Sequence, residues 1–184
     1  RNVPDSVVDW VVLEFRTKQI GGETKYVTGL LLKNGQLMDV NMNSPMYLSK
    51  RFLTDDEYYI VVRHRNHLSV VTENPVRMAA NTTITELDFS KPGVLFGHTD
   101  AVKPLAKQID NTIIYGMISG DVNSDGKIDD TDYLSCWDVL YNPTNKTIDL
   151  PSYKYYDMNL SGIINTRDLN FILNNRGRIT LVTP

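Results

Sequence analysis

Short apolar runs, separated by turn residues, dominate the first two thirds of the chain. Val7–Arg16 is rich in β-branched and aromatic residues and almost continuously apolar, which predicts a strand buried on both faces. Tyr26–Leu32 predicts a second strand, and the pair Asn34-Gly35 that follows is a strong hairpin signal. Further strands are predicted at Glu57–His64, Leu68–Val71, Ile84–Phe89 and Thr112–Ile118. The pattern predicts an all-β domain over residues 1–115, an antiparallel, immunoglobulin-like sandwich, with residues 90–111 as a loop or one helical turn.

The hydrophobic period changes near the carboxy-terminal end. Apolar residues recur at helical spacing over Asp130–Tyr141 and again over Thr166–Asn175, and a proline or a glycine ends each pattern. We therefore expect a second, small all-α domain over residues 116–184. The chain then returns to β-branched residues at Ile179–Thr183, an unusual composition for a solvated tail. We expect this segment to lie against Thr112–Ile118, as a paired strand or an apolar clasp that closes the second domain.

Composition narrows the class of protein. The 184 residues are 41% hydrophobic and 22% charged, as in ordinary globular proteins, and no apolar run approaches the ~20 residues that a membrane span needs. A net charge of −3 without a basic cluster argues against nucleic acid as the partner. The single cysteine, Cys136, excludes an internal disulfide framework and a cysteine-rich zinc site. Because it lies on a predicted helix with no histidine nearby, we expect Cys136 to be structural.

The negative charge gathers in one twelve-residue stretch, 121–132, which reads DVNSDGKIDDTD. Carboxylates this dense repel one another unless a cation lies among them. Oxygen donors occupy loop positions one, three, five, nine and twelve, and position seven offers a backbone carbonyl: Asp121, Asn123, Asp125, Asp129, Asp132 and Lys127. Gly126 stands at position six, where such a loop turns sharply. This spacing predicts a calcium site, and the absence of soft ligands argues against a transition metal.

A second copy of the pattern begins 36 residues later, over 157–168 (DMNLSGIINTRD). Its predicted ligands are Asp157, Asn159, Ser161, the Ile163 carbonyl, Asn165 and Asp168. The internal repeat strengthens both matches, so we expect two calcium ions. The second loop has two carboxylates where the first has four, which predicts weaker binding. Both loops carry an isoleucine at position eight, Ile128 and Ile164, and we expect the loops to join there through a short β-contact.

Candidate chemistry outside these loops is sparse. His64 and His67 have a spacing that can bind a metal, but on a strand they would point to opposite faces, and no third ligand is obvious. We interpret them as the polar end of a hairpin. Exposed aromatic side chains would offer a platform for sugars, although most of them are expected in the core; the candidates are Tyr26, Tyr47, Tyr58 and Tyr59.

Residues 116–178 resemble a type I dockerin, on the strength of GDVNSDGKID, LNFILNNRGR, an Asp at position twelve of each loop and the lack of a full entering helix. The resemblance implies an EF-hand-like pair of loop–helix calcium repeats that present a surface to a cohesin. The implied partner-selecting positions are Asp130-Thr131 and Thr166-Arg167. Because these pairs differ, two interchangeable binding modes are not expected. The segment before the dockerin is similar to β-modules near the carboxy ends of secreted bacterial proteins.

Three functions remain open. The first is a non-catalytic calcium-binding module of an extracellular or cell-surface bacterial protein, docking to a cohesin-like partner or to its own β-domain. The second is a carbohydrate-binding or adhesion module in which calcium is only structural. The third, an enzyme built on His64 and His67, is the least favoured.

Overall fold

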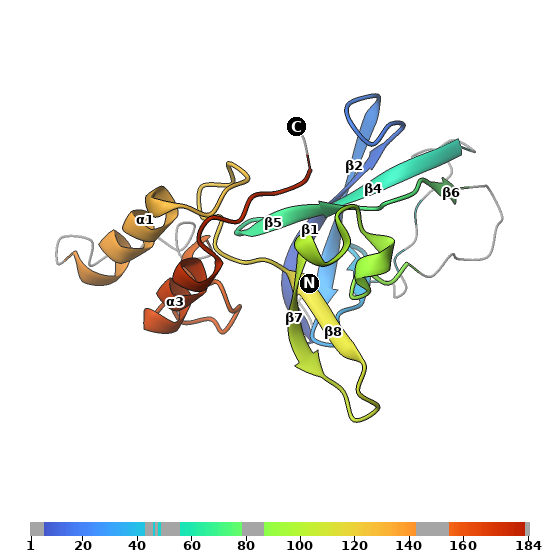
Figure 1. The fold of residues 1–184 in the computed structure, drawn as a ribbon. Coiled ribbons are helices and arrows are strands. Elements are labelled where there is room, and N and C mark those ends of the chain that lie inside the picture. Colours follow the sequence, from blue (N-terminus) through green and yellow to red (C-terminus); the bar gives the residue numbers. More distant parts are fainter. Residues whose placement is uncertain are drawn as a thin grey trace. The chain divides into compact units, whose positions relative to one another are not determined.

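The computed structural model describes residues 6–42, 46, 48, 56–78, 87–142 and 155–182. The chain divides into two compact units. Unit 1 comprises Arg1–Arg63, Val70–Gly116 and Leu181–Pro184, and unit 2 comprises His64–Ser69 and Met117–Thr180. Figure 1 colours the chain from blue to red, and the two long helices of unit 2 are its orange and red elements. The compact units therefore assign residues 64–69, 116 and 181–184 differently from a simple cut after residue 115.

A six-stranded sheet, most of whose residues belong to unit 1, has the order β3-β2-β1-β4-β5, with β6 paired to β4. Its strands are β1 (Val7–Arg16), β2 (Thr24–Leu32), β3 (Leu37–Asp39), β4 (Asp56–His64), β5 (His67–Val71) and β6 (Val76–Met78). A separate two-stranded sheet joins β7 (Val102–Lys107) to β8 (Ile113–Met117). The predicted β-rich region is confirmed, while its immunoglobulin-like sandwich arrangement stays a prediction.

The central strand, β1, differs from its prediction in the burial of its first half. Trp10 is 38% exposed, whereas Phe15 is almost completely buried. The reason is pairing, because β1 pairs with β2 along most of its length but with β4 only over residues 12–16. In this second half, one face is apolar and the other carries the buried charges of Glu14 and Arg16. Burial on both faces is therefore correct only there, and one of the two faces is polar.

The short connections follow local sequence signals closely. Gly35 has φ +83, and the amides of Leu32 and Gly35 close the turn by donating to the carbonyls of Gln36 and Leu32, each at 2.9 Å. This confirms the predicted hairpin between β2 and β3. The predicted strand at Ile84–Phe89 lies largely outside the described residues.

Residues 90–111 contain more structure than predicted. Two 3₁₀ turns, η1 (Pro92–Val94) and η2 (His98–Asp100), precede β7. Strand β7 has exposed side chains along most of its length and contains a proline, so it shows no alternation of apolar and polar residues. Without that alternation, its sequence carries no strand signal.

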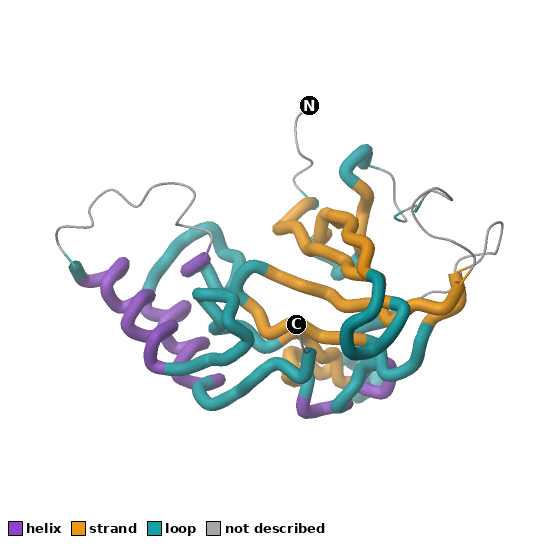
Figure 2. The backbone as a smooth tube through the Cα atoms, turned by 90° about the horizontal axis from the view of Figure 1, so that it is seen from above, coloured by secondary structure: helices purple, strands orange, loops and turns teal. Residues whose placement is uncertain are grey.

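Unit 2 contains the two predicted helices, α1 (Asp130–Tyr141) and α3 (Thr166–Asn175), which lie side by side in Figures 1 and 2. The chain reaches the first loop from β8, not from a helix, as the dockerin resemblance implies. Both helices begin with a capping box, a reciprocal pair of hydrogen bonds at the first turn. Buried apolar side chains form the core of the unit: Leu68, Ile118, Val122, Ile128, Cys136, Met158, Leu169 and Ile172.

The carboxy-terminal segment pairs with a different partner from the one predicted. Ile128 donates to the Arg178 carbonyl at 2.9 Å and accepts from the Gly177 amide at 2.8 Å, and Thr180 donates to the Gly126 carbonyl at 2.8 Å. The expected pairing of Ile179–Thr183 with Thr112–Ile118 is therefore wrong. So is the expected β-contact at position eight, because among the described residues the backbone partners of Ile128 are Gly177 and Arg178.

Candidate metal centre

The first candidate loop, residues 121–132 (loop 1), is folded around the carboxylate of its first residue. The amides of Asp125 and Gly126 donate to the two Asp121 oxygens at 3.0 and 3.1 Å. Such a turn needs left-handed backbone, and Ser124 and Gly126 supply it with φ values of +58 and +85. The chain thus wraps its own backbone amides around a carboxylate that is 5% exposed.

The last residue of loop 1 ties its two ends together. Asp132 Oδ1 accepts from the Val122 amide at 2.8 Å and from the Asn123 amide at 3.3 Å, and Oδ2 accepts from the Asp129 amide at 2.9 Å. Asp129 caps α1 by accepting from the Thr131 amide at 2.7 Å. Asp132 is completely buried, so its charge lies beneath the loop.

The middle of loop 1 is held by side chains at positions three and five. Asn123 Oδ1 accepts from the Asp125 amide at 3.0 Å, and its Nδ2 donates to Asp125 Oδ2 at 2.9 Å. Asp125 Oδ1 accepts from the Lys127 amide at 2.9 Å. The structure therefore connects the five predicted side-chain ligands of loop 1 in one network, while Lys127 enters it through its amide.

Residues 157–168 (loop 2) repeat the hydrogen bonds from main-chain amides to the first and last carboxylates. The Asp157 oxygens accept from the amides of Ser161 and Gly162 at 3.0 and 2.8 Å. Asp168 accepts from Met158, Asn159 and Asn165 at 2.9, 3.4 and 2.9 Å, in the order seen for Asp132. Leu160 and Gly162, at positions four and six, have φ +57 and +81. Two unlike sequences thus adopt one backbone conformation.

The loops differ at position five and in what covers position eight. Ser161 accepts from the Ile163 amide at 3.3 Å, as Asp125 does from Lys127, and its hydroxyl also contacts the Ile163 carbonyl at 3.2 Å. That carbonyl is the predicted position-seven ligand of loop 2. Ile128 is completely buried at position eight of loop 1 because residues 177–180 lie across it, whereas Ile164 is only partly buried.

The buried carboxylates make the charge of these loops costly without a cation. Four lie almost or completely out of solvent: Asp121, Asp132, Asp157 and Asp168. Among the described residues, no ion pair reaches any of them. Burial raises the pKa of Asp121 to about 6, and the neighbouring carboxylates of Asp132 and Asp125 add to the effect. Burial also raises the pKa of Asp132. A bound cation would relieve both effects.

The donor set fits a hard cation. Carboxylate, amide, hydroxyl and main-chain carbonyl oxygens are the ligands that Ca²⁺ takes, six to eight at a time. Within the described part of the chain, no group of three or more His, Cys, Asp and Glu side chains converges on one point. A calcium ion here would therefore need the amide and carbonyl oxygens of the loops in addition to their carboxylates.

Residues 64–69 are a part of unit 2 that the sequence did not indicate. Leu68 is 1% exposed within the core of the unit, and its amide donates to the Ile118 carbonyl at 2.8 Å. Thr180 Oγ1 donates to the Ser69 carbonyl at 2.8 Å. Leu68 lies 50 residues before its backbone partner, Ile118, and no local pattern signals such a distant partner.

The two histidines of this segment face each other. His64 ends β4, His67 begins β5, and their ring centroids are 4.5 Å apart, edge to face. A two-residue turn, Arg65-Asn66, reverses the chain between them, which confirms their interpretation as the end of a hairpin; on one continuous strand they would point to opposite faces. They still form no group of three metal-binding side chains within the described residues.

Cys136 lies in the core of unit 2 and is completely buried. Burial raises the pKa of its thiol to about 12, with a small contribution from the charge of Asp168. The thiol is therefore protonated near neutral pH, which suits the structural role expected for it.

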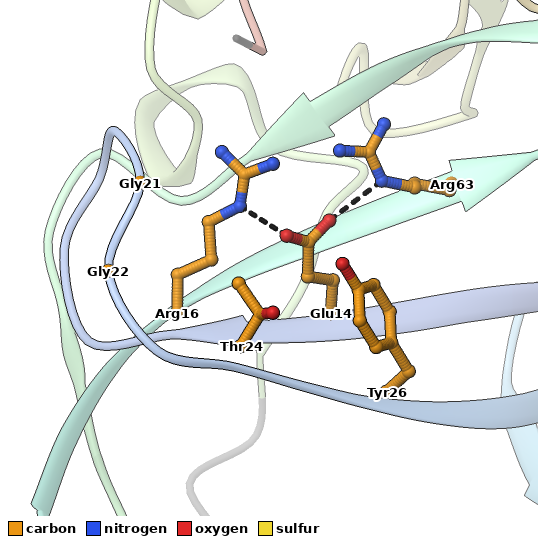
Figure 3. Close-up of a pocket in the computed structure, with 7 residues that line it drawn as sticks. All are labelled: Glu14, Arg16, Gly21, Gly22, Thr24, Tyr26 and Arg63. Carbon is orange, nitrogen blue, oxygen red and sulfur yellow. Dashed lines mark hydrogen bonds and ion pairs between the residues drawn. The ribbon is translucent and has the colours of Figure 1, made fainter. Parts of the chain in front are cut away.

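A polar cavity of about 460 Å³ lies in unit 1 and is lined by Glu14, Arg16, Gly21, Gly22, Thr24, Tyr26 and Arg63 (Figure 3). The Glu14 carboxylate accepts from Nε of Arg16 at 2.5 Å and from Nε of Arg63 at 2.7 Å. Burial acts to raise the pKa of Glu14, but these two guanidinium groups outweigh it and hold the pKa below its ordinary value. Tyr26, on the rim, is 57% exposed.

Two of the other aromatic candidates are less accessible. Tyr58 is buried, Tyr59 is partly buried, and Tyr47 lies outside the described residues. Of the four predicted platform residues, Tyr26 alone is shown to be exposed.

Comparison with known proteins finds one family model that matches part of the chain. Residues 119–175 match the family model of the type I dockerin domain, as the resemblance of residues 116–178 predicted. Dockerin domains bind calcium and dock to cohesins, and they typically occur in extracellular bacterial proteins. No curated protein and no solved structure matches the chain. Among the described helices, none is long and apolar enough to cross a membrane.

Proposed function

We propose that residues 116–184 form a dockerin that binds two calcium ions, and that residues 1–115 form a β-domain without catalytic activity. In loop 1 the ligands are Asp121, Asn123, Asp125, the Lys127 carbonyl, Asp129 and Asp132. In loop 2 they are Asp157, Asn159, Ser161, the Ile163 carbonyl, Asn165 and Asp168. We further propose that the protein acts outside a bacterial cell or on its surface, where millimolar calcium would load both loops.

One observation carries this proposal. The two loops have the same left-handed positions and the same amide-to-carboxylate hydrogen bonds, although their sequences differ at most positions. In each, a completely buried carboxylate at position twelve is bonded to amides at both ends of its loop. A calcium ion would neutralise carboxylates that are otherwise buried together.

The partner we propose is a cohesin-like protein. Binding of purified type I cohesins to the immobilised full chain should be seen with calcium and lost in chelator. The variant Asp132→Ala/Asp168→Ala serves as the control, since it removes position twelve from both loops. Docking to the chain's own β-domain would instead give no cohesin binding and a calcium-dependent change in hydrogen exchange within unit 1.

Calorimetry tests the calcium step separately. Titration of the calcium-stripped protein should give heat for two ions, and thermal melting should show a transition that moves upward with calcium. Identical melting curves with and without calcium, together with no heat of binding, would contradict the proposal.

A glycan-binding function is the second candidate, favoured by the exposed Tyr26 ring beside the polar cavity of unit 1. Aromatic faces stack on the apolar faces of sugars, and arginine pairs bind sugar hydroxyls or carboxylates. A glycan array probed with the wild type and with Tyr26→Ala distinguishes the candidates. Glycan binding that Tyr26→Ala abolishes would favour this function, and calcium would then be only structural.

A further inference from the structure

Each calcium loop is held from outside by one buried asparagine, and the two asparagines come from unrelated parts of the chain. At loop 1, Asn175 Nδ2 donates to the Ser119 carbonyl at 2.7 Å, two residues before Asp121. At loop 2, the carbonyl two residues before the loop belongs to Tyr155, and Asn66 Nδ2 donates to it at 3.2 Å. The two loop entrances therefore have the same hydrogen bond.

The sequence repeat shows that α1 has no asparagine at the position that corresponds to Asn175 of α3. Asn175 is the last residue of α3, and the residue 36 positions earlier, in α1, is Val139. A valine side chain has no donor. The carbonyl at the entrance of loop 2 instead receives its hydrogen bond from Asn66, in the turn between His64 and His67.

Asn66 also reaches the first ligand residue of loop 2. Its Nδ2 donates to the Asp157 main-chain carbonyl at 3.0 Å, and the main-chain carbonyl of Asn66 accepts from the Gly120 amide at 2.9 Å. Beside it, the Arg65 carbonyl accepts from Ser124 Oγ at 3.0 Å. Asn66 is completely buried, and its bond to the Asp157 carbonyl is buried as well, so loss of the carboxamide would leave the Tyr155 and Asp157 carbonyls to be satisfied in another way.

We propose that Asn66 is a positioning residue for the calcium site of loop 2, in the place that Asn175 has for loop 1. The proposal rests on calcium binding by the loops. By fixing the main chain at residues 155 and 157, the carboxamide sets where the Asp157 carboxylate points. The calcium-binding unit is then residues 64–69 together with 117–180, a larger unit than the dockerin segment alone. Substitution of a residue that orients a metal ligand in this way commonly lowers metal affinity by about 10- to 100-fold.

The test uses nuclear magnetic resonance on the full chain, because each loop has its own reporter. The Gly126 and Gly162 amides donate to the first carboxylates of loops 1 and 2. In Asn66→Ala, the calcium concentration that half-saturates the Gly162 signal should rise about 10-fold. The calcium concentration that half-saturates the Gly126 signal should stay within about twofold of its wild-type value. Asn175→Ala should show the reverse, and Asn174→Ala, which removes an exposed carboxamide beside Asn175, should change neither signal.

A measurement without calcium separates this proposal from calcium binding itself. In calcium-stripped buffer, the Ser161 and Gly162 amides should exchange hydrogen faster in Asn66→Ala than in wild type or Asn175→Ala. A wild type that binds no calcium would refute the proposed function, while the exchange pattern would still decide the positioning role. Equal changes in the half-saturating calcium concentrations of Gly126 and Gly162, or no change in either, would overturn the positioning role of Asn66.

Asn66→Asp guards against a general folding defect. It keeps the shape of the side chain but replaces the donor with an oxygen, so it should reproduce the selective loss at Gly162. Collapse of all unit 2 signals in both variants would show that Asn66 is needed for folding as a whole, and would overturn the specific role.

Discussion

Loops 1 and 2 share one backbone conformation but have different side-chain donors and different surroundings. Both bend at positions four and six with matching φ values and hold a buried carboxylate at position twelve. Loop 1 adds carboxylates at positions five and nine and is crossed by residues 177–180, whereas loop 2 has Ser161 and Asn165 there. What the loops share is Asp or Asn at positions one, three and twelve and glycine at position six. Local hydrogen bonds from main-chain amides to these side-chain oxygens account for the common conformation. The number of charges is left to set the affinity.

The largest effect should follow from removing position twelve of one loop at a time. Asp132→Ala deletes the carboxylate that bonds Val122 and Asp129, and with it the predicted last ligand of loop 1. We expect calcium affinity of loop 1 to fall by on the order of 100-fold or more, with loop 2 retained. Asp168→Ala should do the opposite. Calorimetry resolves the two sites, and loss of both ions from either variant would show that the loops bind as one cooperative unit.

Acidity should affect loop 1 through Asp121. Its pKa is raised from 3.8 to about 6 without calcium, so the folded, metal-free unit binds a proton more tightly than the unfolded chain does. Protonation of Asp121 therefore adds about 2–3 kcal/mol to the free energy of unfolding. This contribution is fully present below about pH 4 and is lost as the pH rises through 6. Asp132, also raised, acts in the same direction.

This pH effect is measured by melting the calcium-stripped protein from pH 4 to 7.5. The free energy of unfolding of unit 2 should decrease as pH rises, and the stabilisation by added calcium should increase over the same range because calcium displaces the proton. Asp121→Asn should flatten both trends. A metal-free protein that becomes more stable toward pH 7 would contradict the assignment.

Exchanging position five tests whether charge count explains the difference between the loops. Ser161→Asp gives loop 2 a third carboxylate, and Asp125→Ser removes one from loop 1. We expect loop 2 to bind calcium roughly 10-fold more tightly in the first variant and loop 1 roughly 10-fold more weakly in the second. Asn174→Asp adds the same charge at an exposed position outside both loops and serves as the control for general electrostatics. Equal effects of Ser161→Asp and Asn174→Asp would rule out a ligand role for position five.

The smallest effect is expected at Cys136. Its thiol is buried and protonated, with its raised pKa of about 12, and it makes no predicted contact with calcium. Cys136→Ser should leave the calcium affinity of both loops within about twofold while lowering the melting temperature, because a hydroxyl is buried in place of the thiol. Cys136→Ala separates the cost of the hydroxyl from that of the lost volume. A larger loss of affinity with the fold intact would show that Cys136 contributes to the site.

The amino-acid sequence by itself determined the loops and the two helices of unit 2. The hydrogen bonds that shape loop 1 span ten residues at most, from the Val122 amide to Asp132, so their pattern is visible in twelve consecutive letters. The same holds for the hairpin at Gly35, where one positive φ decides the turn. Local bonds of this kind leave a fixed spacing in the sequence.

The tertiary structure alone decided what surrounds the loops. Asn66 bonds the Asp157 carbonyl from 91 residues away, and Thr180 bonds the Ser69 carbonyl from 111 residues away. Contacts between residues this far apart leave no regular spacing in the sequence, and each needs only one polar atom at the right place. The sequence alone therefore does not indicate which asparagine makes the contact. The same reason explains the wrong partner expected for the carboxy-terminal segment. Apolar, β-branched composition predicted that Ile179 would pair, but only the folded backbone placed it opposite Lys127.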